Sequence, residues 1–390
     1  MSDVVSLRDQ TSPPALAHVD LPVVPDDDAL SEIFLRVPPQ PHSLLRASHV
    51  CRSWRRIVTD PNFLRSFRAH HHDSPPLLGV FHNNCYEGVP RFTPTAGNDD
   101  RPASAAARVF SCPAHWRVLD CRHGRVLLHA VARDAPPVLV LWDPLTRRCE
   151  QIQMPPEFRK DDGERLSGAV VCRAGGDMPT TAGTVTAALA HSCAVYSSEA
   201  GTWSEVISFD ELPVWSDLLP KPCVVIGNTL YQPVSGRYTL SFDIGNRTSA
   251  VIPHPPETEW MDVQIMRLDG QKLGLVVSDN ADFSLRLWAR EGAGDRHWVL
   301  RWIVQLDTLK PLSAAARPGA CNLRVVKLVG ACDYGNVIFL WTTLGSFMFH
   351  LDTMELKKLS YDNTMMSGSG ALYPYESFFA TLQWRRTQAD

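Results

Sequence analysis

The sequence feature that most constrains the fold is an internal repeat in the C-terminal part of the chain. A glycine begins an apolar strand five times, at Gly124, Gly183, Gly227, Gly270 and Gly335. Each copy then reaches a second apolar strand, a tight turn and a third strand, and the turns fall at Asp143, Glu199, Asp243, Glu291 and Asp352. Copies spaced by about 45 to 60 residues predict one small unit that recurs around an axis.

This repeat predicts a β-propeller, because closing the array removes the exposed sheet edges that an open row of strands would leave. The remaining strand-like material lies at residues 76–116 and 378–384. We expect these segments to share a sixth blade, in which the last strand completes a sheet that the start of the domain begins. Seven blades, a sandwich and a pair of smaller β-domains stay open. The recurring Trp142, Trp203 and Trp288 should be blade core rather than a ligand cage.

The N-terminal part has a helical period instead. One face of an amphipathic helix is marked by apolar residues at i, i+3, i+4 and i+7, which are Leu30, Ile33, Phe34 and Val37. Asp26 to Asp28 would cap this helix. A second helical segment covers residues 43–58, with a predicted break near Val50, and one or two further turns cover residues 62–67.

The chain therefore divides into four parts: a disordered tail (1–19), a helical domain (20–68), a linker (69–75) and the propeller (76–390). The predicted fold class is α+β multidomain, with a small all-α domain followed by an all-β propeller of about six blades. The helical domain is too small to bury much by itself, and it has more apolar positions than one face requires. We therefore expect a partner to cover part of its surface.

Composition limits the partners and the compartment. Lys and Arg number 38 and Asp and Glu 42, and the net charge of -4 argues against nucleic-acid binding and membrane docking. No span reaches the roughly 18 apolar residues that cross a bilayer, and the N-terminus lacks a signal-peptide pattern. The ten cysteines form no CxxC pair and are expected to be reduced and mostly buried. We expect the cytoplasm or the nucleus.

Few residues are candidates for chemistry. The run His70 to His72 could hold a metal, but adjacent histidines splay apart and no other pair stands at zinc-finger spacing. Cys112 and Cys121 flank His115 without a nucleophile signature, which favours buried strand cysteines. Motifs of the GxGxxG, P-loop, GxSxG and HExxH types are absent from the sequence. We expect no catalytic residue, no cofactor and no metal.

One stretch of the helical domain resembles a known family. Residues 24–67 carry a proline, an apolar helix, a Val-Pro stop, a Leu-Leu pair and the string Val-Cys-Arg-Ser-Trp-Arg at residues 50–55. This pattern resembles the F-box, the module that binds the Skp adaptor of cullin-based ubiquitin ligases. Two departures are Val24-Pro25, where the family usually has Leu-Pro, and a slightly longer loop at residues 38–43. More loosely, the rest of the chain looks like plant F-box proteins with an F-box-associated β-propeller.

The resemblance implies a non-catalytic, substrate-recognition subunit of a Skp-cullin-F-box ubiquitin ligase. The F-box would dock on the Skp adaptor, and through it a cullin, while loops at one propeller face would hold an unknown protein target. The implied adaptor contacts are Pro25, Leu30, Ile33, Leu44, Val50, Cys51 and Trp54. For Trp54, a place in the helical core is an equal alternative, because a tryptophan buries more area than its neighbours.

Two other functions stay open. The propeller could hold an enzymatic or small-molecule site, with the F-box regulating the abundance of the protein. Perturbed carboxylates clustered at the central channel would favour this function. The protein could instead be a non-degradative scaffold bound to the adaptor, and unchanged target levels on its removal would favour that function.

Overall fold

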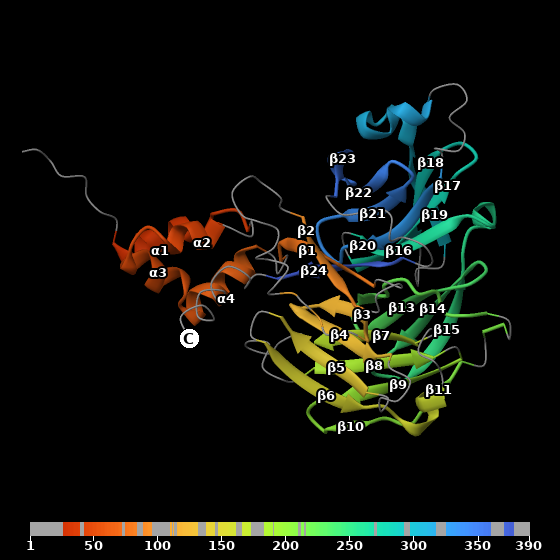
Figure 1. Cartoon of the computed structure of the whole chain (residues 1–390), viewed down its shortest axis with the longest axis horizontal. Coiled ribbons are helices and arrows are strands. Elements are labelled where there is room, and N and C mark those ends of the chain that lie inside the picture. The colour runs from red at the N-terminus through yellow and green to blue at the C-terminus, as the bar shows by residue number, and fades with distance from the viewer. Residues whose placement is uncertain are drawn as a thin grey trace, which may run out of the picture.

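A computed structural model shows a small helical unit followed by six β-sheets arranged as a propeller (Figure 1). The structure describes residues 26–39, 43–71, 75–83, 89–95, 110, 112, 115–131, 138–144, 147–160, 166–172, 183–189, 191–209, 212–213, 216–268, 271–291, 297–316, 325–359 and 370–377. Several sequence predictions lie outside these residues: the tail at 1–19, Pro25, His72, Gly270 and the strand at 378–384. Within the described ranges, no helix is both long and apolar enough to span a membrane.

The helical unit contains four described helices: α1 (Asp27–Leu35), α2 (Ser43–Ser48), α3 (Arg52–Val58) and α4 (Pro61–His70). The predicted break near Val50 is confirmed, because α2 and α3 are separate helices. Helix α4 is longer than the one or two turns predicted and continues past residue 68, where the sequence placed the end of the domain. The Asp60 side chain caps it by accepting the backbone N–H groups of Asn62 and Phe63, at 2.8 and 3.1 Å.

Each of the five repeat copies forms one sheet. The first contains β3 (Trp116–Arg122), β4 (Arg125–Ala130), β5 (Val138–Asp143) and β6 (Arg148–Gln153). The second contains β7 (Leu166–Cys172), β8 (Gly183–Leu189), β9 (Ser192–Ser197), β10 (Thr202–Trp203) and β11 (Ile207–Ser208). The third contains β12 (Val224–Ile226), β13 (Thr229–Val234), β14 (Tyr238–Asp243) and β15 (Thr248–Pro253). The fourth contains β16 (Asp262–Leu268), β17 (Lys272–Asp279), β18 (Ser284–Glu291) and β19 (His297–Gln305). The fifth contains β20 (Val326–Ala331), β21 (Val337–Thr342), β22 (Gly345–His350) and β23 (Glu355–Lys358).

Every copy has a strand that the sequence repeat did not reveal. The missed strand precedes the repeated glycine, as β3 precedes Gly124 and β12 precedes Gly227. Gly124, Gly227 and Gly335 have φ values of 71°, 59° and 77°, so they lie in the turn between the first two strands rather than at the start of a strand. The missed strands line the propeller axis, since β3 contacts β7 and β16 contacts β20.

The sixth sheet joins the two ends of the domain. Its order is β2 (Arg91–Pro94), β1 (Leu77–His82) and β24 (Leu372–Glu376). The prediction that a C-terminal strand completes this sheet is confirmed by β24 at Leu372–Glu376, whereas the strand predicted at residues 378–384 lies outside the described residues. The segment was missed because Pro374 interrupts it, and proline usually argues against a strand. Strand β24 contacts β3 and β20 and therefore belongs to the inner ring.

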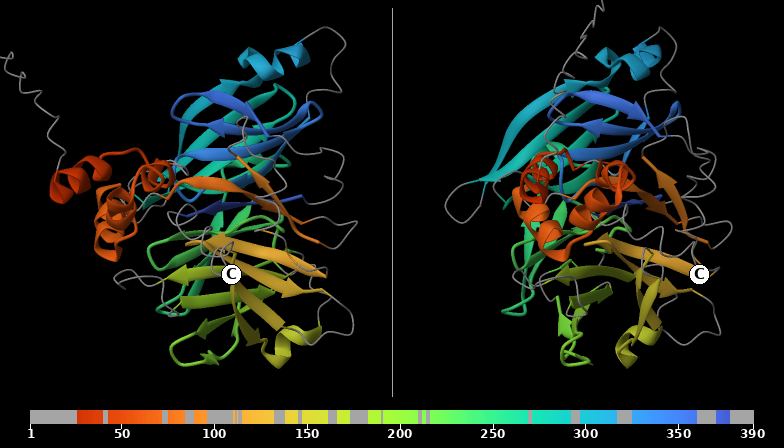
Figure 2. Two further views of the ribbon diagram at one scale, coloured as in Figure 1. Left: turned by 60° about the vertical axis from the view of Figure 1, so that its left-hand side comes forward. Right: turned by 90° about the vertical axis from the view of Figure 1, so that its left-hand side faces the viewer.

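The helical unit lies beyond one end of the propeller strands (Figure 2). At that end the Ser377 N–H donates to the Pro76 carbonyl (3.1 Å), and the Tyr375 hydroxyl donates to the Gly124 carbonyl (2.9 Å). The turns between first and second strands therefore share a face with the helices, and we call it the helix-side face. Because strands alternate in direction, the connections from the last strand of one sheet to the first strand of the next lie on the opposite face, here called the far face.

Neighbouring sheets pack through their apolar faces. Trp142 is buried, and its ring centre lies 6.1 Å from that of Phe81 on β1. Trp203 and Trp288 are partly buried and pack against two other clusters between sheets. The three tryptophans are thus part of the blade core, as the repeat predicted. Cys51 and Cys149 are exposed free thiols, and five further free thiols are buried: Cys112, Cys121, Cys193, Cys223 and Cys332.

Candidate functional site

The residues predicted to contact an adaptor fall into two groups in the helical unit. Leu30 and Leu44 are buried in its core, where they pack with Phe34, Ala47, Ile57, Val58, Phe63 and Phe67. Ile33 and Val50 are instead 51% and 61% exposed, and Cys51 is exposed as well. Leu30 and Leu44 are therefore core residues in this structure, and the surface candidates are Ile33, Val50 and Cys51.

Local structure explains why these apolar side chains reach solvent. Leu30 and Phe34 are four residues apart in α1 and face the core together, which turns Ile33 away from it. Val50 lies in the short connection between α2 and α3, where its N–H donates a hydrogen bond to the Ala47 carbonyl (3.1 Å). Cys51 caps α3, because its sulfur accepts the Trp54 N–H at 3.5 Å. Local hydrogen bonds thus fix the backbone that carries these exposed side chains.

Trp54 lies between these groups. It is half-buried, and its ring meets the Phe34 ring edge to face with the centres 4.9 Å apart. It also packs against the helical core. The alternative that made Trp54 a core residue therefore agrees with the structure, and a contact between its exposed part and an adaptor stays a proposal.

Asp27 has a role that the sequence did not reveal. The sequence predicts that Asp26 to Asp28 cap the helix, but the side chain that accepts the Ala29 N–H (2.7 Å) belongs to Asp26. The Asp27 carboxylate instead accepts the Ser53 hydroxyl at 2.8 Å and pairs with Arg56. This bridge joins α1 to α3 at the surface. The only sequence signal was an acidic residue next to a helix start, which a cap already explained.

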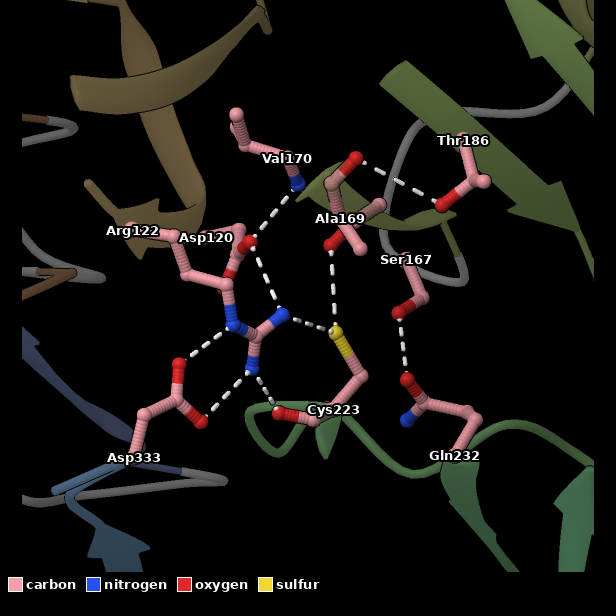
Figure 3. Close-up of polar contacts among 10 residues, drawn as sticks. Asp120, Arg122, Ser167, Ala169, Val170, Thr186, Cys223, Gln232 and Asp333 are labelled. Carbon is pink, nitrogen blue, oxygen red and sulfur yellow. Dashed lines mark hydrogen bonds and ion pairs between the residues drawn. The ribbon is translucent and has the colours of Figure 1, made fainter. Parts of the chain in front are cut away.

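A second candidate site lies at the centre of the propeller, around Arg122 at the end of β3 (Figure 3). Its guanidinium contacts Asp333 after β20 (Nε to Oδ2, 2.5 Å) and Asp120 on β3 (Nη1 to Oδ2, 3.2 Å). It also donates to the Cys223 sulfur at 3.3 Å and to the Cys223 carbonyl. The Val170 N–H of β7 donates to Asp120 at 2.8 Å. Arg122 and Asp120 together thus join elements from four sheets.

Carboxylates do gather at this centre, which is the observation that would favour an enzyme. Burial raises the pKa of Asp120 to about 6, although the charge of Arg122 opposes this change. Burial, followed by the charge of Asp333, raises the pKa of Glu376 well above its usual range. However, the cavity that these residues line measures about 10 Å³, which is at the limit for one water molecule. The carboxylates therefore serve a packed ion network, and the architecture fits a non-catalytic role.

The other chemical candidates do not assemble into a site. Burial raises the pKa of the Cys112 thiol to about 12 and that of Cys121 well above its usual range, whereas a nucleophilic cysteine needs a lowered pKa. The rings of His70 and His71 lie edge to face, with their centres 5.1 Å apart, and no third ligand joins them within the described residues. Within the described residues, no three potential ligands among His, Cys, Asp and Glu come together.

A larger cleft, of about 260 Å³, lies between the fourth and fifth repeat sheets on the helix-side face. Its cations are already paired, since Glu291 binds both Lys272 (3.0 Å) and Arg301. At its other side the Asn336 amide donates to Asp352 at 3.1 Å. The cleft is smaller than most ligand pockets, which span about 300–1,000 Å³.

Some solved structures resemble the chain at low sequence identity. One is the WD40 domain of SCAP from fission yeast, at 13% identity and a TM-score of 0.37, which covers 63% of this chain and 55% of that chain. A second is BBS1N in complex with ARL6DN, soaked with mercury, at 10% identity and a TM-score of 0.36, covering 70% and 75% of the two chains. A third is the Cps50 (Swd1) β-propeller domain of Myceliophteria thermophila, at 11% identity and a TM-score of 0.36, covering 64% and 86%. No curated protein matches the chain.

Two family models match the chain, one on each unit. The model of the F-box domain matches residues 26–66, which span the four helices up to the middle of α4. The model described as "F-box protein AT5G49610-like, beta-propeller" matches residues 117–377, from β3 to the end of β24. The plant origin stays a prediction. Because the second match covers more than half of the chain and an F-box precedes it, the chain belongs to the family of F-box proteins with an AT5G49610-like β-propeller.

Proposed function

We propose that the chain is the substrate-recognition subunit of a Skp-cullin-F-box ubiquitin ligase. The observation that carries the proposal is the exposure of Ile33 and Val50 on an otherwise well-packed F-box. Apolar side chains of this size gain about 1.5–3 kcal/mol each when they are fully buried. Leaving two of them in water on fixed backbone has a physical reason if a partner covers them.

The partner proposed for this surface is a Skp-family adaptor, and through it a cullin. F-box domains generally bind Skp adaptors. Helical interfaces of this type depend on a few buried apolar anchors inside a ring of weaker contacts. Ile33 and Val50 would be such anchors, with Cys51 and the exposed part of Trp54 beside them. The buried Leu30 and Leu44 would hold the surface in shape without touching the adaptor.

The propeller would then hold a protein target. The chain would make and break no bond; it would raise the effective concentration of target lysines near a ubiquitin-charged enzyme elsewhere in the complex. The packed centre around Arg122 supports this role, because it leaves the propeller surface rather than its channel for recognition. Such a complex would work in the cytoplasm or the nucleus.

Binding to a purified Skp-family adaptor tests the proposal. The original chain should bind, and the variants Ile33→Asp and Val50→Asp should each lose at least about tenfold in affinity, because a charge would be buried in an apolar interface. Ile303→Asp is a matched control, since Ile303 on β19 is also 51% exposed but lies on the propeller. This control should bind like the original chain.

Binding and loss of binding by a variant can both be interpreted, because the substituted residues are exposed. The variants should keep the thermal unfolding profile of the original chain, whereas substitutions at Leu30 or Leu44 would disturb the core itself. If the original chain does not bind, or if Ile303→Asp weakens binding as much as Ile33→Asp, the proposed adaptor surface is wrong.

A further inference from the structure

Trp260 is the most exposed large apolar side chain among the described residues, at 96% of its full area. It lies in the connection from β15 to β16, directly after the short 3-10 helix η2 (Pro256–Thr258). A tryptophan usually buries about 150–250 Å² and dominates the core or interface in which it lies. Here the indole contributes almost nothing to the packing of the fold, so its place in the loop calls for another reason.

The loop presents this side chain in a fixed way. The Thr258 side chain is buried and donates to the Pro255 carbonyl at 2.7 Å, while the Met261 N–H donates to the Thr258 carbonyl at 3.2 Å. Before it, the buried His254 ring makes a 2.8 Å hydrogen bond with the Thr239 hydroxyl. A rigid aromatic side chain on a rigid loop loses little conformational entropy when a partner covers it.

The charges next to Trp260 are negative. Glu257 and Glu259 are both exposed in the same loop. Glu259 pairs with Arg237 at 3.9 Å, and the two side chains are 49% and 38% exposed, so this pair is weak. Asp262 is different, because it already binds Lys221 at 2.6 Å and accepts the Leu328 N–H. The loop that carries the indole thus also carries two exposed carboxylates, those of Glu257 and the weakly paired Glu259.

The position of the loop suits a target. It connects the last strand of one sheet to the first strand of the next, and it therefore lies on the far face, opposite the helix-side face at Gly124 and Pro76. A partner bound there would not compete with a protein bound to the F-box.

We propose that Trp260, together with Glu257 and Glu259, is a docking point for a basic segment of the target protein. A lysine or arginine of the segment would lie over the indole face within about 6 Å, which is the geometry of a cation–π contact. Neighbouring basic residues would pair with the two glutamates. A purely apolar segment would leave those carboxylates unmatched, and an acidic segment would be repelled. That the basic segment belongs to a target protein rests on the proposed function, but the binding of a basic segment to this loop does not.

A library of random capped heptapeptides, screened against the purified full chain at low salt, tests this inference. Peptides with two or more Arg or Lys residues should be enriched, and the most enriched one is resynthesised for affinity measurement by fluorescence anisotropy. Its affinity should fall about tenfold or more in Trp260→Ala and in the double variant Glu257→Gln/Glu259→Gln. It should also weaken as ionic strength rises.

Met354→Ala provides the matched control. Met354 is also an exposed apolar residue with a positive φ (55°, against 66° for Trp260), but it lies in a turn on the helix-side face. This variant should bind the peptide like the original chain. Enrichment without basic residues, no enrichment, or equal affinity in Trp260→Ala would each overturn the inference. Adaptor binding measured on the same proteins separates the two proposals, since Trp260→Ala should leave it unchanged.

Discussion

Arg122 shows how one side chain can hold distant parts of the chain together. Its guanidinium is buried. Two of its partners, Cys223 and Asp333, lie 101 and 211 positions further along the sequence. Removing the guanidinium would leave Asp120 and Asp333 close together in a low-dielectric centre without a counter-charge. Such an uncompensated buried charge is costly, even where the complete ion network adds little net stability.

We therefore expect Arg122→Met to lower the free energy of unfolding of the propeller by about 3–5 kcal/mol in urea titrations. Arg301→Met is the control, because Arg301 also pairs with a carboxylate, Glu291, but is 44% exposed. Its effect should stay within about 1 kcal/mol. Similar losses in the two variants would show that the centre is not held by Arg122.

The buried His254 predicts a pH dependence of stability. Burial, followed by the charge of Arg237, lowers the pKa of His254 from 6.5 to about 4 in the folded chain. Between these values the unfolded chain binds the proton and the folded chain does not. The stability that comes from this difference is fully present above pH 6.5 and is lost as the pH falls towards 4.

His254→Gln should therefore make stability less dependent on pH over this window. The slope of unfolding free energy against pH, measured by urea titration, should fall, and the summed difference should reach up to about 3 kcal/mol. An unchanged slope in His254→Gln would mean that another group takes up the proton.

At the scale of elements, the sequence predicts the strands that carry a turn signal. The second, third and fourth strands of each copy were predicted because a glycine or an acidic turn bounds them, as Asp243 does by accepting the N–H groups of Gly245 and Asn246. The inner strands had no such boundary of their own. Strand β12 is only three residues long, and β24 contains Pro374, so neither has a run that periodicity can detect.

The helices show the same limit for the candidate site. The period of α1 identified Leu30, Ile33 and Phe34 together, because a sequence pattern cannot separate a side chain at the edge of the apolar face from one at its centre. Only the packing of α3 and α4 against α1 shows that Ile33 lies outside the core. The Arg122 network could not be predicted for another reason. Its members lie far apart in the sequence, between Asp120 and Asp333, and share no motif. Trp260 looked like any loop residue until its exposure was known.

At the scale of the whole molecule, one short strand decides whether the propeller is a closed ring. Strand β24 pairs with β1 on one side and packs against β3 and β20 of the neighbouring sheets. The approach to β20 is so close that a Cβ added at Gly330 would lie 2.4 Å from the Leu372 carbonyl oxygen. Tyr375 on the same strand is buried against Phe81 and Phe110. Closure therefore depends on one strand of five residues, Leu372–Glu376, whose pairing partner β1 begins the propeller.

Two shortened chains test this dependence directly. A chain that ends at Ser377 keeps all of β24 and should unfold cooperatively, with the midpoint temperature of the full chain. A chain that ends at Gly370 lacks the strand, so β1 loses one of its two pairing partners. The buried side chains of Val80 and Phe81 then lose their contacts with Leu372 and Tyr375. We expect this chain to unfold over a broad temperature range, with a midpoint about 10 °C below that of the full chain. It should also bind a hydrophobic dye before heating. The far-UV signal of the F-box helices should persist in both, because their core is made by residues of α1 to α4 alone. If the chain ending at Gly370 unfolds like the one ending at Ser377, the inner strand does not close the ring, and the remaining interfaces between sheets must be sufficient.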